Sequence, residues 1–246
     1  MKRSIAALAL AIAALGGVAL AAPPRPGIPA AVADPLRPAA DTARDAVRKP
    51  AEALAFAQVK TGDTVAELLP GGGYFTRILA RAVGPRGHVY ALIPSAFAQR
   101  PGGLDAINAL AAQYGNVTVV PADLAGFTLP QPVDVAWTSE NWHDFHNGPT
   151  ANPGGIAKAV FAALKPGGVF YIEDHAAAPG TGATATSTLH RIEASTVISE
   201  LTAAGFKLDG QGTFLANPAD PHTAGVRDPS VQGKTDKFAL RFRKPR

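Results

Sequence analysis

A single stretch, residues 64–76, constrains the fold of this chain more than any other part of the sequence. It opens with a short apolar run, which is typical of a buried parallel strand, and it breaks at Pro70 and the three glycines that follow. An amphipathic helix is predicted directly afterwards, because Phe75, Ile78 and Leu79 repeat at helical spacing. A strand, a glycine-rich turn and a helix in this order form the first half of a nucleotide-binding type of site. The glycines let the backbone approach a ligand, and the start of the helix offers free N–H groups.

The acidic residue at the end of this predicted strand narrows the choice of ligand. A carboxylate there would repel the pyrophosphate of a dinucleotide, whereas Glu67 suits a ligand that carries an amine or ribose hydroxyl groups. The glycines alone do not decide the question, because a tight connection from strand to helix also needs glycine. The acid and the glycines together therefore indicate a site for a small molecule with amine or hydroxyl donors.

The stretch resembles motif I of the class I S-adenosylmethionine-dependent methyltransferases, whose pattern is acid-x-Gly-x-Gly-x-Gly. Glu67, Gly71 and Gly73 match this pattern, and Leu69 stands where the first glycine is expected. The resemblance implies S-adenosylmethionine as the cofactor, with its methionine end near Glu67 and the glycines beneath it. The cofactor-binding residues that it implies are Glu67, Pro70, Gly71, Gly72, Gly73, Tyr74, Asp123, Leu124 and Glu140.

Two further positions bear on this cofactor. The strand predicted over residues 88–93 ends in Ile93, where dinucleotide-binding enzymes and this family usually carry an acid for the ribose hydroxyls. Either backbone and Ser95 hold the ribose, or the cofactor binds weakly or not at all. Asp123 follows the strand predicted over residues 117–120, where the family places an acid that recognises the adenine amino group. A turn aspartate accounts for Asp123 equally well.

Strands and helices alternate along the rest of the chain, which indicates an α/β fold. With the resemblance, this pattern predicts a Rossmann-like class I methyltransferase fold: a seven-stranded, mostly parallel sheet with an antiparallel C-terminal hairpin and helices on both faces. Further strands are expected at 133–137, 169–172, 206–208 and 237–242, and further helices at 104–111, 156–164 and 189–201. The Leu-Lys-Pro-Gly-Gly phrase before residue 169 is also typical of the family.

Composition divides the chain into three parts. Residues 1–21 have a basic start, an apolar core and a small-residue end, which predicts a Sec-type signal peptide; a retained membrane anchor is the alternative. Residues 22–40 are rich in proline and are expected to form an extended linker, and residues 41–246 the methyltransferase-like domain. The protein is therefore expected to be periplasmic or secreted, with no membrane contact once the leader is removed.

The resemblance looks closest to exported bacterial proteins that are themselves predicted methyltransferases. In these proteins the phrases found here at residues 44–50, 70–74 and 142–144 recur. The first phrase contains Arg44 and Arg48 and precedes the first predicted strand. A charge run of this kind is usually a solvated face, although many methyltransferases place a helix here that covers the cofactor.

The densest polar and aromatic cluster, residues 138–146, follows the predicted strand at 133–137. Ligands bind beyond the carboxyl ends of the strands in open α/β sheets, so this cluster should flank the glycine loop. A methyl acceptor that must lose a proton needs a base, and a histidine with a carboxylate partner is poised to accept one near neutral pH. The candidate catalytic residues are His143 with Asp144 first, and Asp174 with His175 second.

Two other interpretations of these histidines stay open. In the simpler interpretation, each histidine only forms a hydrogen bond with the backbone of a loop. Alternatively, imidazole and carboxylate groups could converge on a transition metal. The residues that could converge are His143, His146, Asp174, His175 and His190. No dense metal-binding motif joins them, and no metal site is predicted.

Composition excludes several classes of function. The chain has no cysteine, which rules out thiol catalysis, disulfides and thiolate metal sites. The net charge is +4, and removal of Lys2 and Arg3 leaves +2. This charge is too small for a surface that binds nucleic acid. The cluster at 138–146 also lacks the Asn-Pro-Pro-Tyr phrase of amino-directed nucleic-acid methyltransferases.

The predicted function is therefore S-adenosylmethionine-dependent methylation of a small-molecule acceptor that the sequence does not identify. The alternative is a non-catalytic exported protein that kept the fold and binds another small ligand. Ile93 and the exported location favour this alternative, whereas the histidine–carboxylate cluster favours an enzyme. A metal-dependent hydrolase on the same scaffold is a third, more distant interpretation. The sequence does not indicate the oligomeric state.

Overall fold

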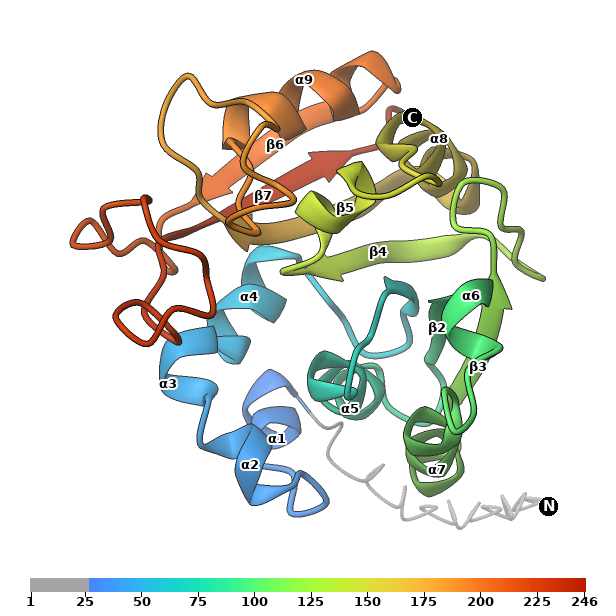
Figure 1. The fold of residues 1–246 in the computed structure, drawn as a ribbon. Helices are drawn as coiled ribbons and strands as arrows, with labels where there is room; N and C mark the ends of the chain where they lie inside the picture. The colour runs from blue at the N-terminus through green and yellow to red at the C-terminus, as the bar shows by residue number, and fades with distance from the viewer. Residues whose placement is uncertain (1–26) are drawn as a thin grey trace, which may run out of the picture.

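The computed structural model describes residues 27–246, so the predicted signal peptide lies outside the described residues. The strands form one seven-stranded sheet in the order β3-β2-β1-β4-β5-β7-β6 (Figure 1). Neighbouring strands from β3 to β5 are parallel, whereas β7 is antiparallel to both β5 and β6. This confirms the predicted sheet with its antiparallel C-terminal hairpin. The strands are β1 (Thr64–Leu68), β2 (His88–Pro94), β3 (Val117–Ala122), β4 (Val133–Ser139), β5 (Leu164–His175), β6 (Lys207–Gly212) and β7 (Lys237–Arg243).

Helices cover both faces of the sheet, as predicted (Figure 1). Successive residues of a strand point to opposite faces, so Val65 packs in one apolar cluster and Ala66 in the other. The first cluster includes residues of α1 (Ile28–Val32), α4 (Pro50–Phe56), α5 (Tyr74–Val83) and α7 (Asp105–Tyr114), and the second includes residues of α8 (Pro153–Ala163) and α9 (Ala194–Ala203). Strand β1 is buried at each of its residues, as a central parallel strand must be.

The main helices after the first strand are α5 (Tyr74–Val83), α7 (Asp105–Tyr114), α8 (Pro153–Ala163) and α9 (Ala194–Ala203). Shorter helical segments are α1 (Ile28–Val32), α2 (Ala39–Thr42), α3 (Asp45–Arg48), α4 (Pro50–Phe56), α6 (Ser95–Ala98) and the 3₁₀ turn η1 (Trp142–His146). Within residues 27–246, none of these helices has both the length and the apolarity that a membrane span requires.

The expectation of an extended linker at residues 22–40 is wrong for the part that the structure describes. Helix α1 forms within it, and Ala31 is fully buried in the apolar cluster on the α5 face. Proline does not prevent this helix, because Pro29 lies in its first turn, where no intrahelical hydrogen bond is lost. Arg37 is also buried and forms an ion pair with Asp45 at 2.6 Å. Residues 28–40 therefore belong to the folded domain.

The helix predicted over residues 189–201 is shorter than expected. Helix α9 starts at Ala194, and Ile192 instead forms an isolated bridge with Ala176 beyond the end of β5. The apolar residues before Ala194 are spaced as in a helix, but the chain here is not helical; Ile192 is fully buried and Leu189 is half-buried. Before the sheet, Lys49 takes a left-handed conformation with φ 46°, so Pro50 begins a new helix, as its ring requires.

Candidate functional site

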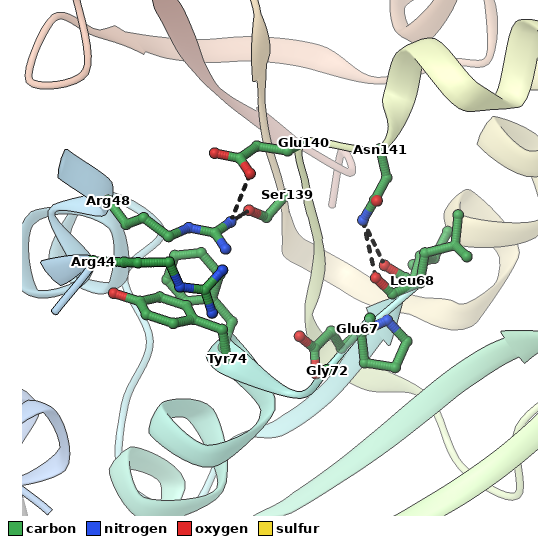
Figure 2. A pocket seen from close by; sticks show the side chains of 13 residues that line it. Arg44, Arg48, Glu67, Leu68, Gly72, Tyr74, Ser139, Glu140 and Asn141 are labelled. Carbon is green, nitrogen blue, oxygen red and sulfur yellow. Dashed lines mark hydrogen bonds and ion pairs between the residues drawn. The ribbon is translucent and has the colours of Figure 1, made fainter. Parts of the chain in front are cut away.

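A pocket of about 210 Å³ lies where β1 and β4 end (Figure 2). Its walls come from three places in the sequence: the helical segment before β1, the glycine loop, and the residues that follow β4. This is the edge at which parallel α/β sheets bind ligands. The lining residues are Arg44, Arg48, Glu67, Leu68, Leu69, Pro70, Gly71, Gly72, Tyr74, Phe75, Ser139, Glu140 and Asn141.

The glycine loop joins β1 to α5 through several left-handed residues. Leu69 has φ 51°, although it stands where the methyltransferase pattern has glycine, so the backbone keeps the glycine conformation with a leucine in place. Gly73 has φ 82° and precedes α5. A Cβ atom on Gly73 would lie 2.3 Å from Leu110 Cδ1, so this glycine permits the close approach of α5 to α7. Gly73 does not line the pocket, whereas Pro70, Gly71 and Gly72 do.

Glu67 presents a buried carboxyl group to this pocket. The residue is 3% exposed, and its Oε2 atom has no hydrogen-bond partner among the described residues. Burial raises the pKa of Glu67 to about 7, against the opposing influence of the Thr76 hydroxyl and the positive charges of Arg48 and Arg77. A buried acceptor without a partner is costly, and a ligand with an N–H or ammonium donor would remove that cost.

Arg48 is the cation at the centre of the pocket. Its Nη2 atom donates to Ser139 Oγ at 2.5 Å and lies 3.4 Å from Glu140 Oε2 (Figure 2). The guanidinium also sits over the ring of Tyr74, 4.5 Å from its centroid. The expectation that the charge run at residues 44–49 forms a solvated face is therefore wrong for Arg48, whose side chain is 11% exposed. Arg44 lines the pocket too, but half of its side chain is exposed.

The two carboxyl groups beside Arg48 have pKa values that are shifted in opposite directions. Burial disfavours the charge of Glu140, but Arg48 and Lys237, whose Nζ lies 2.7 Å from Glu140 Oε1, together lower its pKa to about 2. Burial raises the pKa of Glu173, which lies deeper and accepts hydrogen bonds from Tyr171 and Ser139 at 2.5 Å. Glu140 and Glu173 thus hold the guanidinium of Arg48 in place.

The loop after β4 is tied directly to the glycine loop. The Asn141 side-chain amide donates to the carbonyl oxygen of Leu69 at 3.0 Å (Figure 2). Glu140, one residue earlier, has φ 57°, so the chain turns sharply as it leaves the strand. This contact joins two of the three walls of the pocket.

Asp123 and Leu124, which the resemblance assigns to cofactor binding, do not line the pocket. Asp123 is exposed just beyond β3, and its Oδ1 atom accepts the backbone N–H of Ala125 at 3.0 Å, as in an aspartate turn. Leu124 is buried in the apolar cluster on the α8 face. Ile93 near the end of β2 is buried in the other cluster.

Next to the pocket, the structure brings the four predicted catalytic residues together. His143 is buried, its Nδ1 atom lies 2.8 Å from Asp174 Oδ1, and its backbone N–H donates to Asp174 Oδ2 at 2.8 Å. Its Nε2 atom lies 3.4 Å from Asp144 Oδ1. The ring of His175 is 6.0 Å away, between centroids. Glu140, three residues before His143, connects this cluster to the pocket wall.

Asp174 determines the chemistry of His143. An ionised carboxylate only accepts hydrogen bonds, so the proton of the neutral imidazole lies on Nδ1 and the lone pair on Nε2. Burial lowers the pKa of His143, but the charges of Asp174 and Asp144 outweigh it and raise the pKa. By contrast, burial lowers the pKa of His175 to about 4, and its Nδ1 atom lies 2.8 Å from Thr235 Oγ1. His143 is thus the better proton acceptor of the two.

The other two histidines considered for a metal separate in the structure. His146 points away, with Nε2 3.2 Å from Glu200 Oε1. His190 stays with the cluster: its ring is 5.3 Å from that of His143.

The sequence did not indicate that Arg48 is central to the site. It also did not indicate the contacts of the site that involve Ser139, Asn141, Glu173 and Lys237. Arg48 lay in a phrase that the resemblance highlighted, and that phrase was the one signal in the sequence that could have identified it.

Comparisons with known proteins support the fold. No family model matches the sequence, and no curated protein matches it. Among solved structures, one S-adenosylmethionine-dependent methyltransferase of Aquifex aeolicus aligns with a TM-score of 0.58 at 18% identity, over 82% of this chain and 92% of that one. The partner of the Trm112 methyltransferase activator from Haloferax volcanii gives 0.61 at 21% identity, over 85% and 94%. Aeropyrum pernix fibrillarin, which contains natively bound S-adenosylmethionine, gives 0.51 at 19% identity, over 81% and 76%. The chain therefore has the Rossmann-like fold of these methyltransferases.

Proposed function

We propose that this protein is an S-adenosylmethionine-dependent methyltransferase that acts on a small-molecule acceptor. The observation that carries the proposal is Glu67: a buried carboxyl group with an unpaired oxygen, placed beside the glycine loop at the end of β1. Such a group fits the cationic amino group of the methionine end of the cofactor. Similarity of fold to methyltransferases, one of them with the cofactor bound, supports the same proposal.

The residues present fit the cofactor's methionine end. In the proposal, Glu67 holds the ammonium group, and the start of α5 with the backbone of Gly71 and Gly72 faces the carboxylate. The pocket of about 210 Å³ is smaller than the roughly 300–1,000 Å³ that is usual for whole ligands. The nucleoside half would therefore extend beyond it, over the ends of β2 and β3, where Asp123 is the proposed partner of the adenine amino group.

When bound, the cofactor supplies an electrophilic methyl group, and the protein must place an acceptor against it and take up the proton that the acceptor loses. In the proposal, Nε2 of His143 accepts that proton, because Asp174 keeps the other ring nitrogen protonated. Asp174 acts as the positioning residue, and Asp144 stabilises the imidazolium ion that forms. A hydroxyl or amine acceptor suits this arrangement.

Titration calorimetry with S-adenosylmethionine and S-adenosylhomocysteine tests the cofactor site. We expect micromolar binding that weakens at least tenfold in Glu67→Gln, which keeps the shape of the side chain. Glu52→Gln, an exposed position on α4, is the matched control and should bind like the unchanged protein. The absence of binding of either compound would overturn the proposal.

A non-catalytic small-ligand-binding protein is the second candidate. Ile93 favours it, because the end of β2 is apolar and buried where an acid would hold the ribose. This candidate predicts ligand binding in the same pocket without methyl transfer to any acceptor. We further propose that residues 1–21 direct export, so that either activity would operate outside the cytoplasm; fractionation of cells that express the full chain tests this.

A further inference from the structure

Three side chains of types that bind metal ions, His143, Asp144 and His190, converge in the structure. The Nε2 atom of His143 lies 3.4 Å from Asp144 Oδ1, and Nδ1 of His190 lies 3.6 Å from the same oxygen. All three atoms lie within 4.8 Å of one another. Ligand atoms at about 2.1 Å from a tetrahedral zinc ion are about 3.4 Å apart, so two of the three separations already match such a site. We propose that His143, Asp144 and His190 bind a divalent transition-metal ion.

The surroundings of His143 are those of a metal ligand. A histidine that binds a metal through one ring nitrogen usually donates the other N–H to a carboxylate, which fixes its orientation. Asp174 fulfils this role at 2.8 Å from Nδ1, and it also holds the backbone N–H of His143. The Nε2 lone pair therefore faces Asp144 and His190 on a ring that the protein holds rigidly.

The backbone at His190 supplies an independent observation. This residue has φ 54°, a left-handed conformation that is uncommon for a residue other than glycine and is often found at functional sites. Its neighbour Arg191 is fully buried, pairs with Asp220 at 2.8 Å and donates to the carbonyl oxygen of Ala176. Arg191 thus anchors the loop, and the strained turn beside it directs His190 toward the other two ligands.

The donor set indicates the kind of ion. Two imidazoles and one carboxylate suit Zn²⁺, Co²⁺, Mn²⁺ or Fe²⁺, whereas Mg²⁺ and Ca²⁺ prefer oxygen donors. The side chains of Asp144 and His190 are 46% and 33% exposed, so the ion could enter from solvent. A site with three protein ligands would keep at least one position open for water or a substrate oxygen.

This inference goes beyond the proposed methyl transfer and does not depend on it. With an ion bound, His143 would be a ligand rather than a proton acceptor, and the ion would lower the pKa of an acceptor hydroxyl in the open position. The ion and a proton compete for the same Nε2 lone pair, so one molecule uses one or the other.

The experiment is a metal titration of the purified, untagged protein after removal of metals with EDTA and dialysis, without S-adenosylmethionine. Zn²⁺ binding is followed by calorimetry and Co²⁺ binding by visible absorption. We expect one equivalent to bind, with at least tenfold weaker binding in His190→Ala and in Asp144→Asn. His88→Ala is the matched control, because His88 begins β2 and contacts Thr118 instead of the cluster. It should bind metal as the unchanged protein does.

Two results would overturn the inference: no stoichiometric binding by the unchanged protein, or equal affinity in His190→Ala and the control. Asp144→Asn provides a second test at an exposed side chain, should the change at His190 disturb its strained loop. Asp174→Asn should weaken binding about 10- to 100-fold by releasing the ring of His143. Because this titration contains no cofactor, and the cofactor titration can be run in EDTA, the two proposals can fail separately.

Discussion

One carboxylate holds both the ring and the backbone of a histidine in this protein. Asp174 Oδ1 lies 2.8 Å from Nδ1 of His143, and Asp174 Oδ2 accepts the His143 backbone N–H at 2.8 Å. Asp174 is fully buried at the end of β5, whereas His143 belongs to the turn after β4. The pairing of two adjacent strands thus places a carboxylate under an imidazole that is 31 residues away in the sequence.

Asp174→Asn should lower both stability and the pKa of His143. An amide has one acceptor oxygen in place of two, so one buried N–H loses its partner, at a cost of about 1–3 kcal/mol. Asp174 is also the main influence that raises the pKa of His143 against burial. Urea unfolding and NMR titration of the imidazole measure the two effects. An unchanged pKa in a folded variant would contradict the assigned role of Asp174.

Glu67 should make the protein less stable as the pH rises. Its pKa is raised from 4.5 to about 7, so the folded state holds the proton more tightly than the unfolded state. The stability that this group contributes is complete below pH 4.5 and is lost as the pH rises through 7. At about 1.4 kcal/mol per pKa unit, the whole loss is about 3–4 kcal/mol. Glu67→Gln should remove this pH dependence in urea unfolding at pH 5 and pH 8. If the free energy of unfolding changes equally between pH 5 and pH 8 in both proteins, Glu67 is not held protonated.

Arg48→Ala should destabilise the protein by about 3–5 kcal/mol, because it leaves the buried carboxyl group of Glu173 without the cation beside it. Glu140 and Glu173 both lie within 3.5 Å of the guanidinium. Arg44→Ala is the matched control, since its side chain is half-exposed and it should cost less than about 1 kcal/mol. Equal losses in the two variants, measured by urea unfolding, would mean that Arg48 does not hold the carboxylates together.

Gly73→Ala should cost about 1–3 kcal/mol, because it adds a methyl group against Leu110 at a position with φ 82°. Gly72→Ala is the control: its Cβ would meet nothing within 4 Å, and its φ is not in the left-handed region. Introducing Leu110→Ala should reduce the additional cost of Gly73→Ala, as thermal unfolding of the single and double variants would reveal. If Gly73→Ala costs as much in the Leu110→Ala background as in the unchanged protein, the strain lies in the backbone alone.

The sequence predicted most of the fold because the fold depends on short-range patterns. The apolar run before Pro70, the glycines after it and the helical repeat from Phe75 each place an element within a few residues. The predictions failed where burial came from distant parts of the chain. Ala31 is buried because α5 packs on it, and Ile192 because it bridges to Ala176. Neither contact leaves a local pattern.

The sequence by itself determined the order of strands and helices, the glycine loop with Glu67, and the polar cluster that contains His143. These features depend on residues that are close together in the sequence, because their spacing sets the backbone conformation and the face that is buried. Only the tertiary structure decided which charges meet. Arg48 reaches Ser139 across 91 residues, Lys237 comes to Glu140 from the last strand, and His190 turns toward Asp144. Such meetings depend on how the sheet brings its strand ends together, because a side chain's electrostatic environment is set by neighbours in space rather than in sequence.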